Sequence, residues 1–200
     1  MDTTFMNRGK TLCQGFTLIE LIVTVTIAGI LAAIAIPSFI STINSNRLTT
    51  YTNDFVTALN FARSEAIKRG QQVTVSRRSA TAGTWEGGWN VFVDFDANNA
   101  LDEGNNATLC ETNTDGSPKE DCLLKTQAAL SSGYTLRNPD IPFQDFVAYL
   151  PSGLRKIVAN DTGTSRFRVC DSTASKTNSR SITLNAAGRA SVSKGTSACP

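Results

Sequence analysis

The sequence predicts an α+β protein in which one long N-terminal helix, membrane-spanning in its first half, packs on an antiparallel β head domain. An almost entirely apolar stretch, a helical apolar pattern beyond it and a change to strand-like alternation after Gly70 lead to this fold class. We expect four parts: a polar and basic N-terminal segment at 1–15, a transmembrane helix at 16–36, an amphipathic continuation of that helix at 37–69 and a β-rich globular head at 70–200.

The apolar stretch runs from Phe16 to Ile36. As a helix it would be about 31 Å long, which is enough to cross the hydrocarbon core of a bilayer. Glu20 is its one ionisable side chain. Placing a carboxylate inside such a segment costs free energy, so we expect Glu20 to have a function. Arg8 and Lys10 precede the segment, so we expect the N-terminus to stay in the cytoplasm. A permanent membrane anchor with an incidental Glu20 is the simpler alternative.

The helical pattern continues beyond Pro37, which should kink the helix without ending it. Lys68 and Arg69 suit the negative end of a helix, and Gly70 suits the residue after it. Apolar side chains recur at three- and four-residue spacing and predict a stripe that packs against the head. This stripe consists of Ile40, Ile43, Leu48, Tyr51, Phe55, Leu59, Ala62 and Ala66.

The residues around the apolar stretch resemble a known signal. The run Gly15-Phe16-Thr17-Leu18-Ile19-Glu20 is similar to the class III signal of type IV prepilins. The resemblance implies that a membrane peptidase cleaves after Gly15, that Phe16 becomes the N-methylated first residue, and that Glu20 acts in assembly. In that family, the glutamate offsets the N-terminal amine of a neighbouring subunit, because each charge is costly alone in an apolar environment. Met1 and Met6 are both possible starts.

Strand signals fill the head. The segments 72–76 and 89–95 alternate as strands, and further strands are expected at 123–126, 134–137, 143–150, 166–171, 181–185 and 190–193. The helix end, the first strand and the segment Gly88-Trp89-Asn90-Val91-Phe92-Val93-Asp94 resemble the GspH/FimT/FimU branch of minor pilins and pseudopilins.

An acidic connection separates the second and third predicted strands. Asp94, Asp96, Asn98 and Asp102 have the spacing of a calcium loop, but Asn99 stands where its glycine belongs and Asn105 where its bidentate glutamate belongs. We therefore expect a solvated turn and no metal site. No cofactor is predicted.

The cysteines beyond the apolar stretch are four in number, which indicates disulfides in an oxidising compartment. Four cysteines allow three pairings. We favour a local bridge between Cys110 and Cys122 and a second bridge between Cys170 and Cys199, which would hold the C-terminus.

The C-terminal part is basic. From Leu154 to Pro200 it has eight basic and two acidic residues, and such a face could meet phosphates. The FimT-like members of the branch are DNA-uptake pilins with a Gly-Arg-x-Arg motif, but here Gly188-Arg189 is followed by Ala190-Ser191. The DNA interpretation requires the candidate residues to share one exposed face; they are Arg166, Arg168, Arg180, Arg189 and Lys194.

These observations predict a minor pilin and not an enzyme. The chain has no histidine, which removes histidine-dependent catalysis and histidine-ligated metals. The resemblance implies a single-pass protein of the bacterial inner membrane with a periplasmic head, which then enters a filament and primes or caps its assembly. Its partners would be other pilins, the prepilin peptidase, the membrane and, in one alternative, DNA. A DNA-binding competence pilin and a pseudopilin of type II secretion are the two alternatives.

Overall fold

The computed structural model describes residues 15–102, 110, 112–117, 120–140, 143–175, 177–195 and 198–199. The chain forms two compact units, 1–43 and 44–200. The predicted leader lies outside the described residues up to position 14, and so does Asn105.

One continuous helix, α1, runs from Leu18 to Arg69. Thr17 caps its start, because its Oγ1 accepts a hydrogen bond from the backbone N–H of Glu20 at 3.3 Å. The helix passes through Pro37 without interruption. It ends at Gly70, whose φ of 66° and N–H bond to the carbonyl of Ala66 are typical of a helix C-terminus. The predicted long helix is therefore confirmed.

The second half of α1 belongs to the compact unit of the head, which begins inside the helix at Asn44. One stripe of this part of the helix is buried in the head's core. Tyr51 lies partly buried against that core. Ile40 and Ile43 were predicted on the stripe, but they are 54% and 51% exposed and lie outside this unit. The buried positions are Leu48, Thr52, Phe55, Ala58, Leu59, Ala62 and Ala66.

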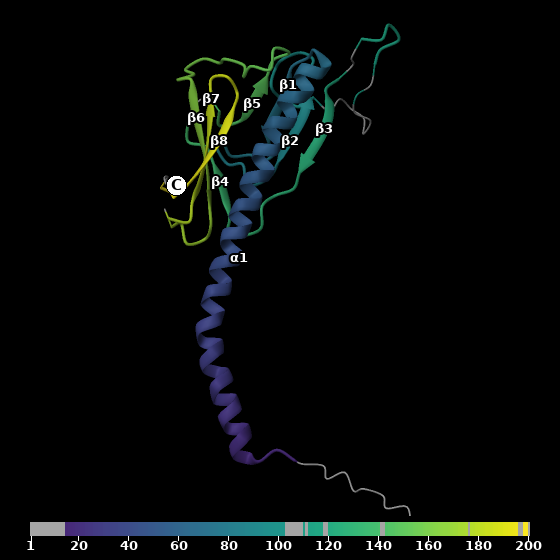
Figure 1. Cartoon of the computed structure of the whole chain (residues 1–200). Helices are drawn as coiled ribbons and strands as arrows, with labels where there is room; N and C mark the ends of the chain where they lie inside the picture. The colour runs from purple at the N-terminus through teal and green to yellow at the C-terminus, as the bar shows by residue number, and fades with distance from the viewer. Residues whose placement is uncertain are drawn as a thin grey trace, which may run out of the picture. The chain divides into compact units, whose positions relative to one another are not determined.

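The head contains two antiparallel sheets of four strands each (Figure 1). The first has the order β3-β2-β1-β5 and consists of β1 (Val73–Arg77), β2 (Trp89–Val93), β3 (Cys122–Gln127) and β5 (Phe146–Tyr149). The second has the order β4-β6-β7-β8 and consists of β4 (Thr135–Arg137), β6 (Thr164–Cys170), β7 (Arg180–Asn185) and β8 (Ala190–Lys194). Each predicted strand overlaps one of these, so the α+β prediction is confirmed.

Phe55 joins the helix to both sheets. Its ring centroid lies 5.0 Å from that of Trp89 on β2 and 4.7 Å from that of Phe167 on β6. Trp85, in the connection before β2, lies 5.3 Å from the same ring and 5.4 Å from Phe167. These four aromatic side chains are at most 1% exposed, so the helix and both sheets share one apolar core.

Candidate functional site

The start of α1 carries the three residues of the predicted signal. Gly15 and Phe16 precede the helix in an exposed segment, and Phe16 is 82% exposed. A Cβ added at Gly15 would have nothing within 4 Å, so this structure gives the glycine no packing role. Thr17 was not singled out in the sequence, although the pattern of a threonine followed three residues later by Glu20 is the signature of a capped helix start.

Glu20 has no partner for its carboxylate within the described part of the chain. The other polar side chains nearby are satisfied inside the helix. Thr24 donates to the carbonyl of Leu21 at 2.9 Å, and Thr26 donates to the carbonyl of Ile22 at 2.7 Å. Between Leu18 and Ile36, Glu20 is therefore the one charged group on an otherwise apolar helix surface, and its carboxylate is available to a group from outside this chain.

The apolar half of α1 is exposed on all sides. Helix α1 is long and apolar enough to cross a membrane, and none of its most apolar stretch is buried inside the protein. Leu18 is 78% exposed, Ile34 is 72% exposed and Phe39 is 68% exposed. Such an apolar surface needs lipid or other apolar helices around it.

The basic residues predicted for DNA binding do not share one exposed face. Arg166 and Arg168 alternate with Phe167 on β6, so they lie on the face away from the core. Arg180 on β7 stands opposite Val169, and Lys194 on β8 stands opposite Arg180, so both belong to the other face. The condition that the DNA interpretation required is therefore not met, because the alternation of the strands divides these residues between two faces.

Arg180 is 7% exposed and has a structural role. Its Nη1 donates to the carbonyl of Asn178 at 3.0 Å, and its Nη2 donates to Ser45 Oγ at 3.1 Å and to Thr49 Oγ1 at 3.4 Å. The guanidinium thus joins β7 to α1. Sequence reasoning missed this role, because an arginine on an amphipathic strand has the same pattern whether it faces solvent or a helix.

The glycine of the Gly188-Arg189 pair is explained by packing. Gly188 has a φ of 75°, and a Cβ added there would lie 2.6 Å from the ring of Tyr149. Tyr149 also donates a hydrogen bond to the carbonyl of Gly188 at 3.0 Å. Arg189 itself is exposed in the turn between β7 and β8. This half of the motif therefore serves the turn and needs no nucleic acid to explain it.

Two disulfides join the cysteines of the head. One connects Cys110 with Cys122 at the start of β3, and the other connects Cys170 at the end of β6 with Cys199. These are the pairs that the sequence favoured. By loop-closure entropy, each bridge stabilises the fold by about 3 kcal/mol.

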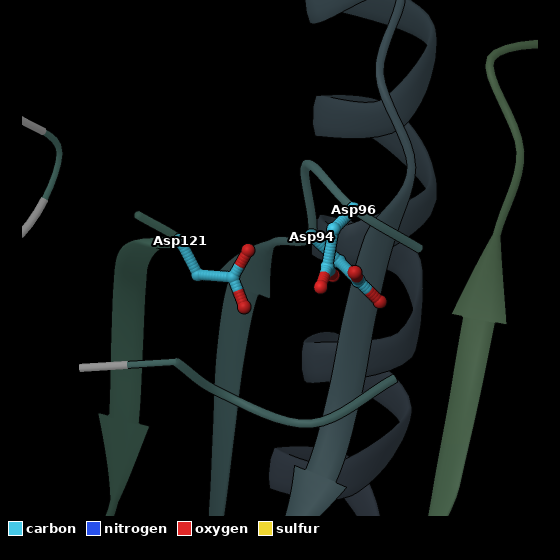
Figure 2. A group of neighbouring side chains, drawn as sticks. All are labelled: Asp94, Asp96 and Asp121. Carbon is cyan, nitrogen blue, oxygen red and sulfur yellow. The ribbon is translucent and has the colours of Figure 1, made fainter. Parts of the chain in front are cut away.

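A cluster of carboxylates lies where β2 ends and β3 begins (Figure 2). Asp94 follows β2, Asp121 precedes β3, and both are buried, whereas Asp96 is exposed. One oxygen from each carboxylate lies within 4.8 Å of the others. Asp121 accepts hydrogen bonds from the backbone N–H groups of Phe95 at 3.0 Å and Asp102 at 3.1 Å. Sequence reasoning missed Asp121, because it is far along the chain from the acidic repeat.

Burial raises the pKa of the Asp121 carboxyl above its usual value. The negative charges of Asp94 and Asp102 act in the same direction, and the hydrogen bonds from the two backbone N–H groups oppose them. The carboxylate of Asp121 is therefore both buried and close to two other negative charges, which disfavours its ionised form.

The sequence matches two protein families, and the fold is similar to that of solved structures. The family model of the type II transport protein GspH matches residues 51–188, and the model of the prokaryotic N-terminal methylation motif matches residues 10–36. Two crystal structures of the type IV minor pilin FimU of Pseudomonas aeruginosa have the same fold. One has a TM-score of 0.53 at 16% identity, covering 76% of this chain and 92% of that one. The other has a TM-score of 0.50 at 15% identity, covering 75% and 95%. No curated protein matches the chain. The chain belongs to the GspH family, in the branch of type IV minor pilins and pseudopilins, and carries the N-terminal methylation motif.

Proposed function

We propose that this protein is a minor pilin that primes or caps the assembly of a type IV pilus. The observation that carries the proposal is the contrast between the two halves of α1. One half is built into the core of the head, and the other presents apolar side chains to its surroundings on every side. A pilin needs this division, because the same apolar surface must contact lipid before assembly and neighbouring helices afterwards.

Before assembly the chain spans the bacterial inner membrane once, with its head in the periplasm. The prepilin peptidase cleaves the bond between Gly15 and Phe16, which lies in an exposed segment before the helix. The new amine of Phe16 is then methylated. The two disulfides suit an oxidising compartment on the far side of the membrane.

Glu20 then sets the register of the subunit in the filament. Its carboxylate pairs with the N-terminal amine of a neighbouring pilin, and the attraction between the two charges offsets the hydration energy that each of them loses. The role of the chain is structural, and the head selects which pilins lie beside it.

The experiment that tests this role is a Glu20→Ala variant in the parent bacterium, with Glu65→Ala as the control. Glu65 is also a glutamate of α1, but it pairs with Lys68 and Arg69 in the same helix. We expect Glu20→Ala to remain membrane-bound and processed but to be lost from sheared filaments, while Glu65→Ala is incorporated normally. Normal incorporation of Glu20→Ala would show that Glu20 has no assembly role.

Processing is tested separately, by the mass of the N-terminal peptide. In a Gly15→Ala variant, leader removal should be slower than in the wild type, because we expect the peptidase to recognise the glycine, which has no packing role in the fold. Cleavage of this variant at the wild-type rate would contradict the proposed site.

A second candidate is a pseudopilin of a type II secretion system, since the matching family model describes a type II transport protein. The same helix serves either machine. Deleting the gene and measuring twitching beside the amount of secreted protein distinguishes the two. Loss of secretion with normal twitching would favour the pseudopilus.

DNA binding is not proposed as the main function. The basic residues on which it depended are divided between the two faces of one sheet, and Arg180 is buried against α1.

A further inference from the structure

We propose that Asp94, Asp96 and Asp121 form a calcium-binding site at the junction of β2 and β3. Figure 2 shows the three carboxylates close together, with Asp121 on one segment of the chain and Asp94 and Asp96 on another. Carboxylate oxygens are the ligands that calcium prefers, and it accepts six to eight of them in irregular geometry, with water completing the shell.

The first argument is the state of the Asp94 carboxylate, which is 1% exposed. Its Oδ2 accepts hydrogen bonds from Gln72 Nε2 at 2.7 Å and from Thr74 Oγ1 at 2.8 Å. Its Oδ1 is buried and has no hydrogen-bond partner among the described residues. An ionised oxygen without a donor is costly in such a place, and a cation beside it would remove that cost.

The second argument is the charge. Three carboxylates offer oxygens within 4.8 Å of one another, and no lysine or arginine of the described segments forms an ion pair with any of them. Lys156 is nearby, but its Nζ donates to the carbonyl of Ala97 at 2.8 Å and to Asn99 Oδ1 at 3.1 Å. A divalent cation would balance most of the charge of the cluster.

The third argument is the backbone conformation of the loop after β2. At one position it is left-handed, as in a calcium loop, which the sequence alone did not show. Asn99 occupies the position where a calcium loop beginning at Asp94 requires glycine, and its φ is 69°. Asparagine tolerates this left-handed conformation better than most residues. Asp121 adds a carboxylate from the start of β3, which replaces the acidic ligand that a continuous loop would supply from its own end.

We expect calcium to bind in preference to magnesium, because Asp96 is exposed on a loop and calcium tolerates irregular ligand geometry. Magnesium requires near-ideal octahedral geometry and gives up its water reluctantly. A bound calcium ion would fasten the two ends of the long connection between β2 and β3, beside the disulfide at Cys122.

The test uses the full-length chain in detergent, stripped of metal with a chelator and titrated with calcium chloride or magnesium chloride. Binding is measured by calorimetry, and the midpoint of thermal unfolding is measured at 10 mM of each ion. We expect one calcium ion per chain with a dissociation constant of about 1 mM, the range of extracellular sites. The midpoint should rise by about 3–6 °C with calcium and by less with magnesium.

Three isosteric variants locate the site. Asp96 is exposed, so the Asp96→Asn variant should fold normally. The Asp94→Asn and Asp121→Asn variants each remove one buried charge. All three should lose the calcium response. Asp115→Asn is the matched control on the same connection, because Asp115 is exposed and contacts Ser117 outside the cluster. It should respond as the wild type does.

Three results would overturn the proposal. They are no calcium binding up to 10 mM, a wild-type response in Asp96→Asn and Asp121→Asn, and equal stabilisation by magnesium.

Discussion

Replacing Arg180 by alanine tests whether this arginine holds β7 to α1 or serves a binding surface. Two of its hydrogen bonds are short enough to be strong, at 3.0 Å to the carbonyl of Asn178 and at 3.1 Å to Ser45 Oγ. The bonds to the carbonyl of Ser179 at 3.3 Å and to Thr49 at 3.4 Å add less. A hydrogen bond to a charged group contributes about 1.5–3 kcal/mol. Because some of this is recovered by water entering the site, we expect the variant to lose about 2–4 kcal/mol of unfolding free energy.

The assay is urea unfolding of the full-length chain in detergent, followed by the fluorescence of the two core tryptophans. With a slope of about 2 kcal/mol per molar urea, the midpoint should fall by about 1–2 M. Arg166→Ala is the matched control, because Arg166 is an exposed arginine of the same sheet, and it should change the unfolding free energy by less than about 0.5 kcal/mol. A loss below 0.5 kcal/mol for Arg180→Ala, or an equal loss for both variants, would refute this account of Arg180.

The remaining predictions concern the turns, the disulfides and a buried phenol. Gly88→Ala should cost more than about 3 kcal/mol and lower the yield of folded protein, because a Cβ there would overlap the backbone at the end of β3; Gly116→Ala, also at positive φ but with nothing within 4 Å, should cost only about 1 kcal/mol. Replacing both cysteines of the Cys170–Cys199 bridge by serine should lower the unfolding free energy by about 3 kcal/mol, and an unchanged thermal midpoint would contradict this. Burial raises the pKa of Tyr149, so the folded chain keeps its phenol protonated while the unfolded chain releases the proton above about pH 10. Stability should therefore fall at higher pH by about 1.4 kcal/mol per pH unit from this group, and Tyr149→Phe should reduce the slope.

The long helix and the strands could be predicted from sequence because each has a local signal. The apolar stretch, the three- and four-residue spacing and the alternation after Gly70 all depend on neighbouring residues. Ile40 and Ile43 show the limit of this reasoning. Their spacing extends the stripe, but periodicity does not say where the partner surface begins, and both are exposed.

The features that escaped prediction depend on contacts between distant parts of the chain. Asp121 meets Asp94 only because β2 and β3 pair with Val93 opposite Cys122. Arg180 reaches Ser45 across 135 positions of sequence. The division of the basic residues between two faces follows from the register of β6, β7 and β8, which charge counting does not reveal. Local patterns thus predict elements, and the pairing of elements decides which side chains form a site.

The continuity of α1 from Leu18 to Arg69 has a mechanical consequence. Where α1 enters the head, beyond Asn44, a pull along the helix would act on the aromatic contacts around Phe55. Separating the sheets from the helix would require the aromatic contacts of Phe55 to break together with the hydrogen bonds of Arg180. Several weak contacts would therefore have to break at the same time, so the helical part of the head should resist separation from the sheets cooperatively.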